Sequence, residues 1–326
     1  MNKKFILSLL IAAGFLLNAC QKDLDVFVPD SGSLNGPDST WYSTITASMP
    51  VSTLRTNLAI TTYTDSIQVN SNVVTLSTPF GLQCTFPPNC CLGNAGQVIT
   101  GTVNVELLLI KNKGDMIRMN RPTTSGDRLL VSGGELFIRL KKENNELHLA
   151  PNIKIQLKYA DAPVNTQMRF FLGDESNPEK FNWLPLTDSA NFVSPYSQGY
   201  TIFTNHLHWV NCDYFFDTSG IAPVTVSASL ANYFTNANTL AFTVFKDLRA
   251  TVAMYGNLAT RKFNTAMLPA GKFITVVVIS KQGNDYFLGY EKTTTATPTT
   301  GSNIQSVSVT PVKKSLADIL SYLNTL

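Results

Sequence analysis

The sequence has few of the residues from which catalytic and metal sites are usually built. Its 326 residues include 3 His and 5 Cys, and only 14% are charged. It contains no HExxH helix signature, no CxxC pair, no GxSxG nucleophile elbow and no glycine-rich phosphate loop. No pair of carboxylates stands out as a general acid and base. These absences predict that the chain is not an enzyme and has no cofactor.

An excess of charge of either sign is also missing. The formal net charge is +3. Removal of residues 1–19 takes away Lys3 and Lys4, so Lys plus Arg falls from 25 to 23 against 22 acids, leaving +1. A nucleic-acid-binding protein needs a clustered basic face to neutralise phosphates, and no such cluster is present. We therefore expect no nucleic-acid partner.

Long apolar runs are missing except at the N-terminus. A basic start, Met1 to Lys4, precedes an apolar run from Phe5 to Leu17, which is short for a membrane span. The run ends in Leu17-Asn18-Ala19-Cys20, which resembles a bacterial lipobox and implies a signal peptide over residues 1–19 with lipid on Cys20. Several acyl chains, at about 0.8 kcal/mol per buried methylene, make a stable anchor. An ordinary secretory signal with a chance cysteine is the alternative.

The segment after Cys20 has the composition of a tether. Residues 20–40 carry Pro, Gly, Ser and Asp, which favour a flexible connection. Gln21 to Asp25 resembles the export signal of Bacteroidota surface lipoproteins. This resemblance implies an outer-membrane lipoprotein facing the cell exterior, with the periplasmic face as the alternative.

Alternating apolar and polar residues dominate the rest of the chain. The clearest runs lie between Val98 and Tyr159, and they are VITGTVNVELLLI, RLLVSGGELFIRLKK, ELHLA and NIKIQLKY. A period of two indicates strands with one face on a core and one in water. The pattern predicts an all-β fold of two β-sandwich-like domains in tandem, at residues 41–217 and 218–326. Leu316, Ile319, Leu320 and Leu323, after a Ser315–Asp318 capping box, predict a short C-terminal amphipathic helix.

Four cysteines remain once Cys20 is set aside. Cys84, Cys90 and Cys91 flank a Pro-Pro turn, and Cys212 stands alone. Outside the cell a structural disulfide from Cys84 to Cys90 or Cys91 is the preferred interpretation. Buried free thiols and a metal site are the alternatives left open.

The histidines give a weak metal signal. On one strand His206 and His208 would share a face, about 7 Å apart, and two imidazoles at that spacing are able to hold one ion. Trp209 and Cys212 beside them favour a packed element. No metal site is predicted, and a metal-dependent hydrolase using this pair is the least favoured function.

Departures from alternation mark the places where a scaffold of strands would meet a partner. The candidate binding loops carry Lys113 and Asp115 in a predicted turn, with Arg121 and Asp127 around the Pro122–Asp127 loop. The Gly133-Gly134 pair indicates a bulge inside a strand. Trp41, Tyr42 and Tyr214 to Phe216 are the candidates for an aromatic platform for sugar rings. For Tyr214 to Phe216 the preferred interpretation is that they pack between the two domains.

Several of these segments together resemble a known module. Gly101 to Leu108, Lys113 to Ile117, Arg121 to Ser125, Leu129 to Glu135 and Trp209 to Asp213 are similar to a ZU5-like β-sandwich of uncharacterised Bacteroidota envelope proteins. The resemblance covers roughly residues 80–217, and ZU5-type domains elsewhere are interaction modules. It implies a non-enzymatic structural or protein-interaction lipoprotein with an envelope protein or glycan as partner. A glycan- or ligand-binding accessory lipoprotein is the alternative.

Overall fold

The computed structural model describes residues 38–177, 179–298 and 302–326. Residues Ser39–Leu326 belong to one compact unit. The signal peptide, Cys20 and the tether up to residue 37 lie outside the described residues, so what the sequence indicates for them stays a prediction. Within the described part, no helix is both long and apolar enough to cross a membrane.

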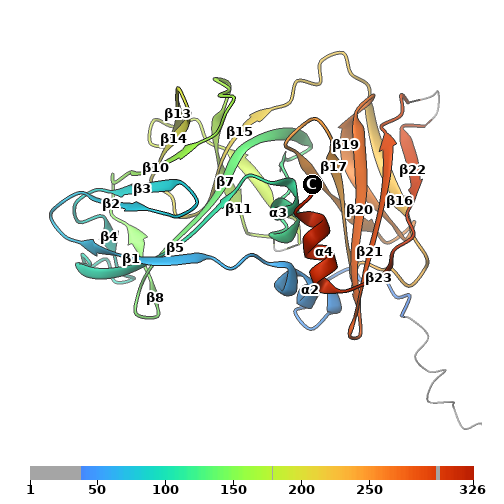
Figure 1. Ribbon diagram of the computed structural model, residues 1–326, viewed down its shortest axis with the longest axis horizontal. Helices are drawn as coiled ribbons and strands as arrows, with labels where there is room; N and C mark the ends of the chain where they lie inside the picture. The colour runs from blue at the N-terminus through green and yellow to red at the C-terminus, as the bar shows by residue number, and fades with distance from the viewer. Residues whose placement is uncertain (1–37, 178, 299–301) are drawn as a thin grey trace, which may run out of the picture. The chain divides into compact units, whose positions relative to one another are not determined.

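The first half of the compact unit is a sandwich of two antiparallel sheets (Figure 1). The large sheet runs, in spatial order, β1 (Tyr63–Val69), β5 (Gly101–Ile110), β7 (Arg128–Lys142), β15 (His208–Phe215), β11 (Arg169–Asp174) and β12 (Asn182–Pro185), with β6 (Thr124–Ser125) and β8 (Asn145–Glu146) beside β7. The small sheet runs β13 (Phe192–Tyr196), β14 (Gly199–Thr204), β10 (Ile155–Ala160), β3 (Leu82–Phe86) and β2 (Val74–Ser77). A separate pair joins β4 (Cys91–Leu92) to β9 (His148–Leu149).

The second half is one curved eight-stranded sheet, the C-terminal sheet. Its order is β22 (Ile304–Ser308), β16 (Pro223–Ser229), β19 (Lys262–Pro269), β18 (Thr251–Asn257), β17 (Thr239–Phe245), β20 (Phe273–Gln282), β21 (Asp285–Thr294) and β23 (Val312–Lys314). The pairing of β22 with β16 is parallel, and the others are antiparallel. The predicted all-β class is therefore confirmed.

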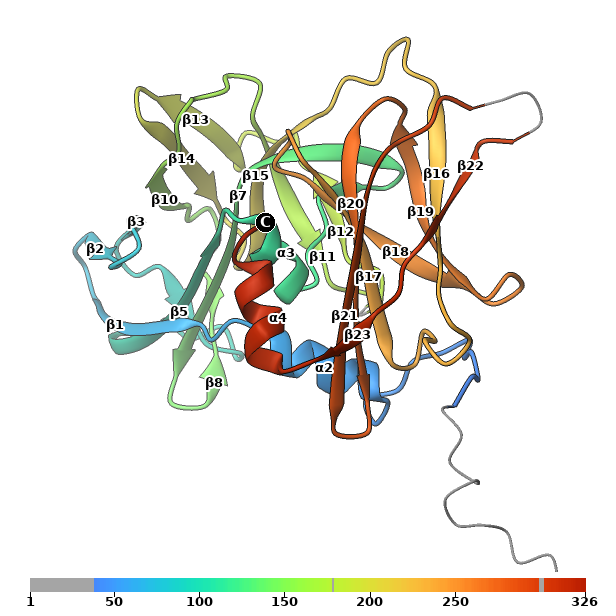
Figure 2. The ribbon, with the colours of Figure 1, turned by 45° about the vertical axis from the view of Figure 1, so that its right-hand side comes forward.

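Three short helices pack on the C-terminal sheet or beside it (Figure 2). They are α2 (Pro50–Leu58), α3 (Lys113–Arg118) and α4 (Leu316–Leu323). The predicted C-terminal helix is confirmed as α4, together with its Ser315–Asp318 capping box. Ile319 and Leu323 are its buried side chains, and they join a core cluster with Val277 and Ile279 of β20.

The N-terminal part of the chain differs from the prediction. Within the predicted first sandwich of residues 41–217, Pro50–Leu58 form the helix α2, because Pro50 starts the helix and Val51, Leu54 and Leu58 fall on one face. That face packs on β17 and β20 of the C-terminal sheet. Trp41, a candidate for an aromatic platform, packs against Phe263 of β19, with 5.0 Å between ring centroids and the rings tilted by 48°. Residues 41–58 thus pack on the second half, although they precede the first.

Strand β7 carries the irregularity that the sequence indicated. Its pairing with β15 passes from Gly134 opposite Cys212 to Ser132 opposite Asp213, so Gly133 is the extra residue of a β-bulge. Residues Leu129 to Leu136 are buried without interruption, because this strand is covered on both faces. The small sheet lies on one side of it, and side chains of α3, β11 and β12 lie on the other.

Candidate functional site

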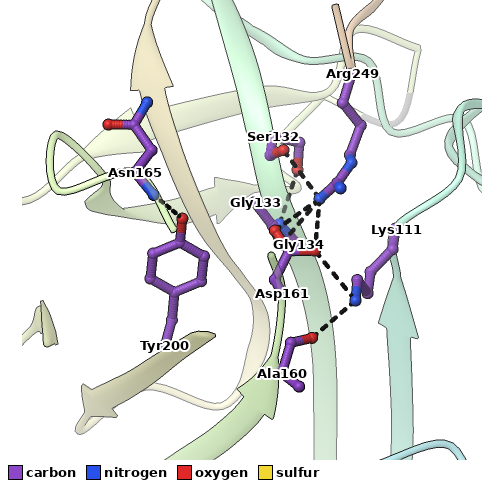
Figure 3. A network of polar contacts seen from close by, with 9 residues as sticks. All are labelled: Lys111, Ser132, Gly133, Gly134, Ala160, Asp161, Asn165, Tyr200 and Arg249. Atoms are coloured by element: carbon purple, nitrogen blue, oxygen red, sulfur yellow. Dashed lines mark hydrogen bonds and ion pairs between the residues drawn. The ribbon is translucent and has the colours of Figure 1, made fainter. Parts of the chain in front are cut away.

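A network of polar contacts joins the two halves beside the bulge (Figure 3). Arg249, in the turn between β17 and β18, binds both carboxylate oxygens of Asp161 through Nη1, at 3.0 and 2.9 Å. Lys111 Nζ lies 3.1 Å from Asp161 Oδ1. The Arg249 Nη1 atom also donates to the carbonyl oxygens of Ser132 and Gly133, at 3.4 Å each. Asp161 is buried, so these two cations compensate its charge where water is scarce.

Backbone bonds strengthen the same junction. Thr123 N donates to Thr251 O at 2.8 Å, and Thr251 N donates to Thr123 Oγ1 at 2.9 Å. Ser132 N donates to Arg249 O at 2.9 Å. These bonds tie β7 and the segment before it to the start of β18 and the turn before it, so they hold the two halves together.

A pocket of about 790 Å³ lies at this junction. Its walls come from the start of β7, the start of β11, the end of β15 with the linker after it, and the facing ends of β16 and β19. The lining residues are Asp127, Arg128, Leu129, Thr166, Gln167, Met168, Arg169, Tyr214, Phe215, Phe216, Asp217, Thr218, Ser219, Ile221, Pro223, Met267, Leu268 and Pro269. Ligand sites typically have volumes of about 300–1,000 Å³ and favour the seams between structural units. This pocket is the candidate site.

The sheet geometry sets Arg128 against an aromatic ring and places Arg169 on the neighbouring strand. Register places Arg169 opposite Asp213, and Phe215 opposite Leu130, so β11 and β7 flank the end of β15. The Arg128 guanidinium carbon lies 3.5 Å from the Phe215 ring centroid. This cation–π contact fixes the plane of the guanidinium against the wall and leaves its N–H edges free to donate.

Within the described part of the chain, the two pocket arginines form no ion pair, although the formal charges of the lining balance, with two arginines and two aspartates. Among the ion pairs and hydrogen bonds of the described residues, none involves the guanidinium of Arg128 or Arg169. A third cation, Lys272, has its Nζ 4.9 Å from the Phe216 centroid. The acids Asp127 and Asp217 share the rim. Asp217 is held in its ionised form, because its Oδ1 accepts from Ser219 N at 2.9 Å and this bond lowers the Asp217 pKa.

The four predicted loop residues are spread over different surroundings. Only Asp127 lines the pocket. Lys113 belongs to α3, not to a hairpin turn, and its Nζ donates to Phe245 O at 2.7 Å. Asp115 pairs with Arg118 on the same helix at 3.3 Å. Arg121 lies between the rings of Phe181 and Trp209, with its guanidinium carbon 4.2 and 4.6 Å from their centroids. Lys113, Asp115 and Arg121 thus serve internal contacts.

The histidine pair does not share a strand face. His206 precedes β15, while His208 starts it with a φ of +65°. The His208 ring contacts Glu146 through Nε2, and its Nδ1 lies 3.4 Å from Glu175 Oε2. Bonds to Glu175 and Glu146 raise the His208 pKa to about 9. Among the described residues, no three or more His, Cys, Asp or Glu side chains are grouped so as to hold a metal ion.

The four cysteines are free thiols in the core of the sandwich. The Sγ atoms of Cys90 and Cys91 lie 3.4 Å apart, and Cys84 sits on β3 of the small sheet. Burial raises the pKa of Cys84 to about 12 and also raises that of Cys212. The structure does not form the disulfide predicted between Cys84 and Cys90 or Cys91. It matches the free-thiol alternative.

A second set of titratable groups lies under the large sheet, on its face opposite the small sheet. Glu135 of β7 and Asp213 of β15 are fully buried, with Asn211 directly opposite Glu135. Asn211 Nδ2 donates to Asp213 Oδ2 at 2.6 Å. Both oxygens of Glu135 and Oδ1 of Asp213 have no hydrogen-bond partner among the described residues. Desolvation raises the pKa of Asp213 to about 7, and it raises that of Glu135 well above its ordinary value, with Asp213 adding to the effect.

The sequence indicates part of the pocket and misses its arginines. The Tyr214–Phe216 run is predicted to lie at a surface or a domain seam, and all three residues line the pocket there. Arg128 and Arg169 carry no local signal, because β15, with which both strands pair, is distant from them in the sequence. No family model matches the chain, and no curated protein matches it either. The fold and the site define an all-β protein with a half-polar pocket between two packed halves.

Proposed function

We propose that this chain is a membrane-tethered, non-enzymatic lipoprotein that binds a ligand in the junction pocket. The observation that carries the proposal is the pocket itself, with its volume of about 790 Å³, aromatic wall and unpaired guanidinium groups. Its polar groups include no nucleophile hydrogen-bonded to a base, which acyl-transfer chemistry would need. The rigid junction supports binding, because a pocket held by fixed elements loses little entropy when it is filled.

The pocket assignment is tested by filling the pocket with an indole. Thr218 is an exposed lining residue on the linker after β15, so Thr218→Trp narrows the pocket without altering the core. Thr260→Trp, at an exposed turn outside the pocket, is the matched control. Thermal shift is measured with a panel of neutral and acidic tetrasaccharides and short peptides. A bound ligand at 100 times its Kd stabilises by about 2.7 kcal/mol, so a rise of roughly 5–10 °C is expected.

We expect at least one panel member to stabilise the parent and Thr260→Trp but not Thr218→Trp. If every stabilising compound acts equally on both tryptophan variants, the pocket is not the binding site.

The proposal also includes the lipid tether at Cys20, which is tested by detergent partitioning. The lipobox resemblance at Ala19-Cys20 supports acylation of Cys20, and the export-signal resemblance at Gln21 to Asp25 supports an outward-facing position at the outer membrane. The parent is expected to partition into the detergent phase of Triton X-114, and Cys20→Ala into the aqueous phase, because the acyl chains supply the membrane affinity. Detergent partitioning of Cys20→Ala would contradict this anchor. Protease is then added to intact cells. Cleavage of the parent indicates that it faces the cell exterior, and protection indicates the periplasmic face.

A further inference from the structure

The charge and hydrogen-bonding groups of the pocket indicate which ligand it takes. We propose that the ligand is an acidic saccharide, whose carboxylate or sulfate group is bound by Arg128 and Arg169. This inference rests on the proposed function, since it names the ligand class of the same site.

The two guanidinium groups provide the anion-binding part. They lie on strands that flank β15, and neither has an acidic partner among the described residues. Arginine binds carboxylates and sulfates through paired N–H donors, and such charge-assisted bonds are roughly twice as strong as neutral ones. Because Phe215 holds Arg128 in one plane at 3.5 Å, little side-chain entropy is lost when the anion binds.

The remaining lining groups suit the hydroxyls and ring faces of a sugar. Thr166, Gln167, Thr218 and Ser219 are exposed and bear hydroxyl or amide groups, which both donate and accept. Tyr214 adds a half-exposed aromatic ring with a hydroxyl. Exposed donors and acceptors beside an aromatic ring match a molecule that is polar at its rim and apolar on its ring faces. A purely apolar ligand would leave these groups and both arginines unpaired, which is unfavourable.

The experiment measures affinity by calorimetry for three probes of equal length, which are tetragalacturonate, a heparin tetrasaccharide and neutral cellotetraose. The variants are Arg128→Gln and Arg169→Gln, each of which removes one charge from the pocket. Arg261→Gln is the matched control, because Arg261 is exposed and lies outside the pocket. Far-UV circular dichroism confirms that each variant is folded.

At least one acidic probe is expected to bind the parent and Arg261→Gln. Each pocket variant should weaken it about tenfold to a hundredfold, as expected for loss of a charge-assisted bond of about 1.5–3 kcal/mol. Binding should also weaken as salt is raised from 50 to 500 mM, because the charges at the rim are screened. The galacturonate and heparin arms separate a carboxylate from a sulfate.

Three results would overturn the inference. The first is cellotetraose binding that Thr218→Trp blocks and the arginine variants leave unchanged, which would keep the pocket as a binding site for a neutral ligand. The second is acidic-probe binding that all three glutamine variants weaken equally, which would indicate general charge attraction. The third is failure of both acidic probes to bind. If Thr218→Trp leaves the binding of every probe unchanged, the pocket is not the binding site and the proposed function itself is wrong.

Discussion

Replacing Gly114 with alanine is expected to destabilise the protein by about 3 kcal/mol, at the upper end of overpacking effects. Gly114 lies in the first turn of α3, and a Cβ atom built on it would overlap the carbonyl oxygen of Leu323 at the end of α4. The obstacle is backbone, so no side-chain rotation relieves it. For a unit of this size each 1 kcal/mol corresponds to roughly 2–4 °C, and a fall of about 6–12 °C in Tm should be measured by calorimetry.

The matched control adds the same methyl group where there is room. Gly220 has a φ of +72°, and no atom lies within 4 Å of the place that a Cβ would take there. Gly220→Ala is therefore destabilised only by the left-handed backbone, which costs about 1 kcal/mol. Limited proteolysis gives a second readout, since displaced α4 should be cut sooner in Gly114→Ala. Equal Tm values for the two alanine variants would show that α3 and α4 do not touch at Gly114.

Stability is expected to fall as the pH rises from about 4 to about 7, because of Asp213. Its carboxyl group is buried, and its folded-state pKa of about 7 lies above the ordinary 3.8. Between these values the folded protein holds a proton that the unfolded chain has released. The stabilisation is therefore fully present below about pH 4 and is lost as the pH rises through 7. The pKa differs by roughly three units between the folded and unfolded states, at about 1.4 kcal/mol each, so the free energy of unfolding should fall by at most about 4 kcal/mol. Buried Glu135, whose pKa is also raised, acts in the same direction.

Urea unfolding across this pH range, with Asp213→Asn as the variant, measures the effect. The amide is neutral at every pH and keeps an oxygen that can accept from Asn211, so the free energy of unfolding should depend less on pH. At pH 8 the variant should be more stable than the parent. Asp65→Asn is the control, because hydrogen bonds lower the pKa of half-buried Asp65 and its contribution is lost on acidification instead. A parent protein of constant stability from pH 4 to 8 would disprove the buried ionisation.

Features that depend on neighbours in the sequence could be predicted, and those that depend on distant partners could not. The run from Arg128 to Lys142, in which apolar residues alternate from Leu136 onward, forms β7 over those residues, with the bulge at its glycine pair. The Ser315–Asp318 capping box also identifies α4 from adjacent residues alone. In contrast, nothing near Lys113 shows that it will bond to the carbonyl of Phe245, and so the sequence predicts a turn where α3 forms.

The difference between local and distant signals also explains which residues of the candidate site could be predicted. The aromatic run at Tyr214 breaks the alternation, and this local signal is enough to single it out. The pairing of Arg128 with Phe215 depends on the register of β7 against β15, which are far apart in the chain. The sequence predicts regular strand geometry at His208, yet this residue takes a positive φ and turns towards Glu146 and Glu175, which lie on separate loops and strands.

The position of α2 has a consequence for the order of folding. Val51, Leu54 and Leu58 are made early in synthesis, but the strands that bury them, β17 and β20, begin only at Thr239 and Phe273. During vectorial synthesis the first sandwich is able to assemble while this apolar face still waits for its partner. Contacts of such long sequence separation slow folding and leave apolar surface open to association. A chain cut at residue 217 would keep this apolar face of α2 exposed. Burial of α2 therefore depends on strands that are synthesised late.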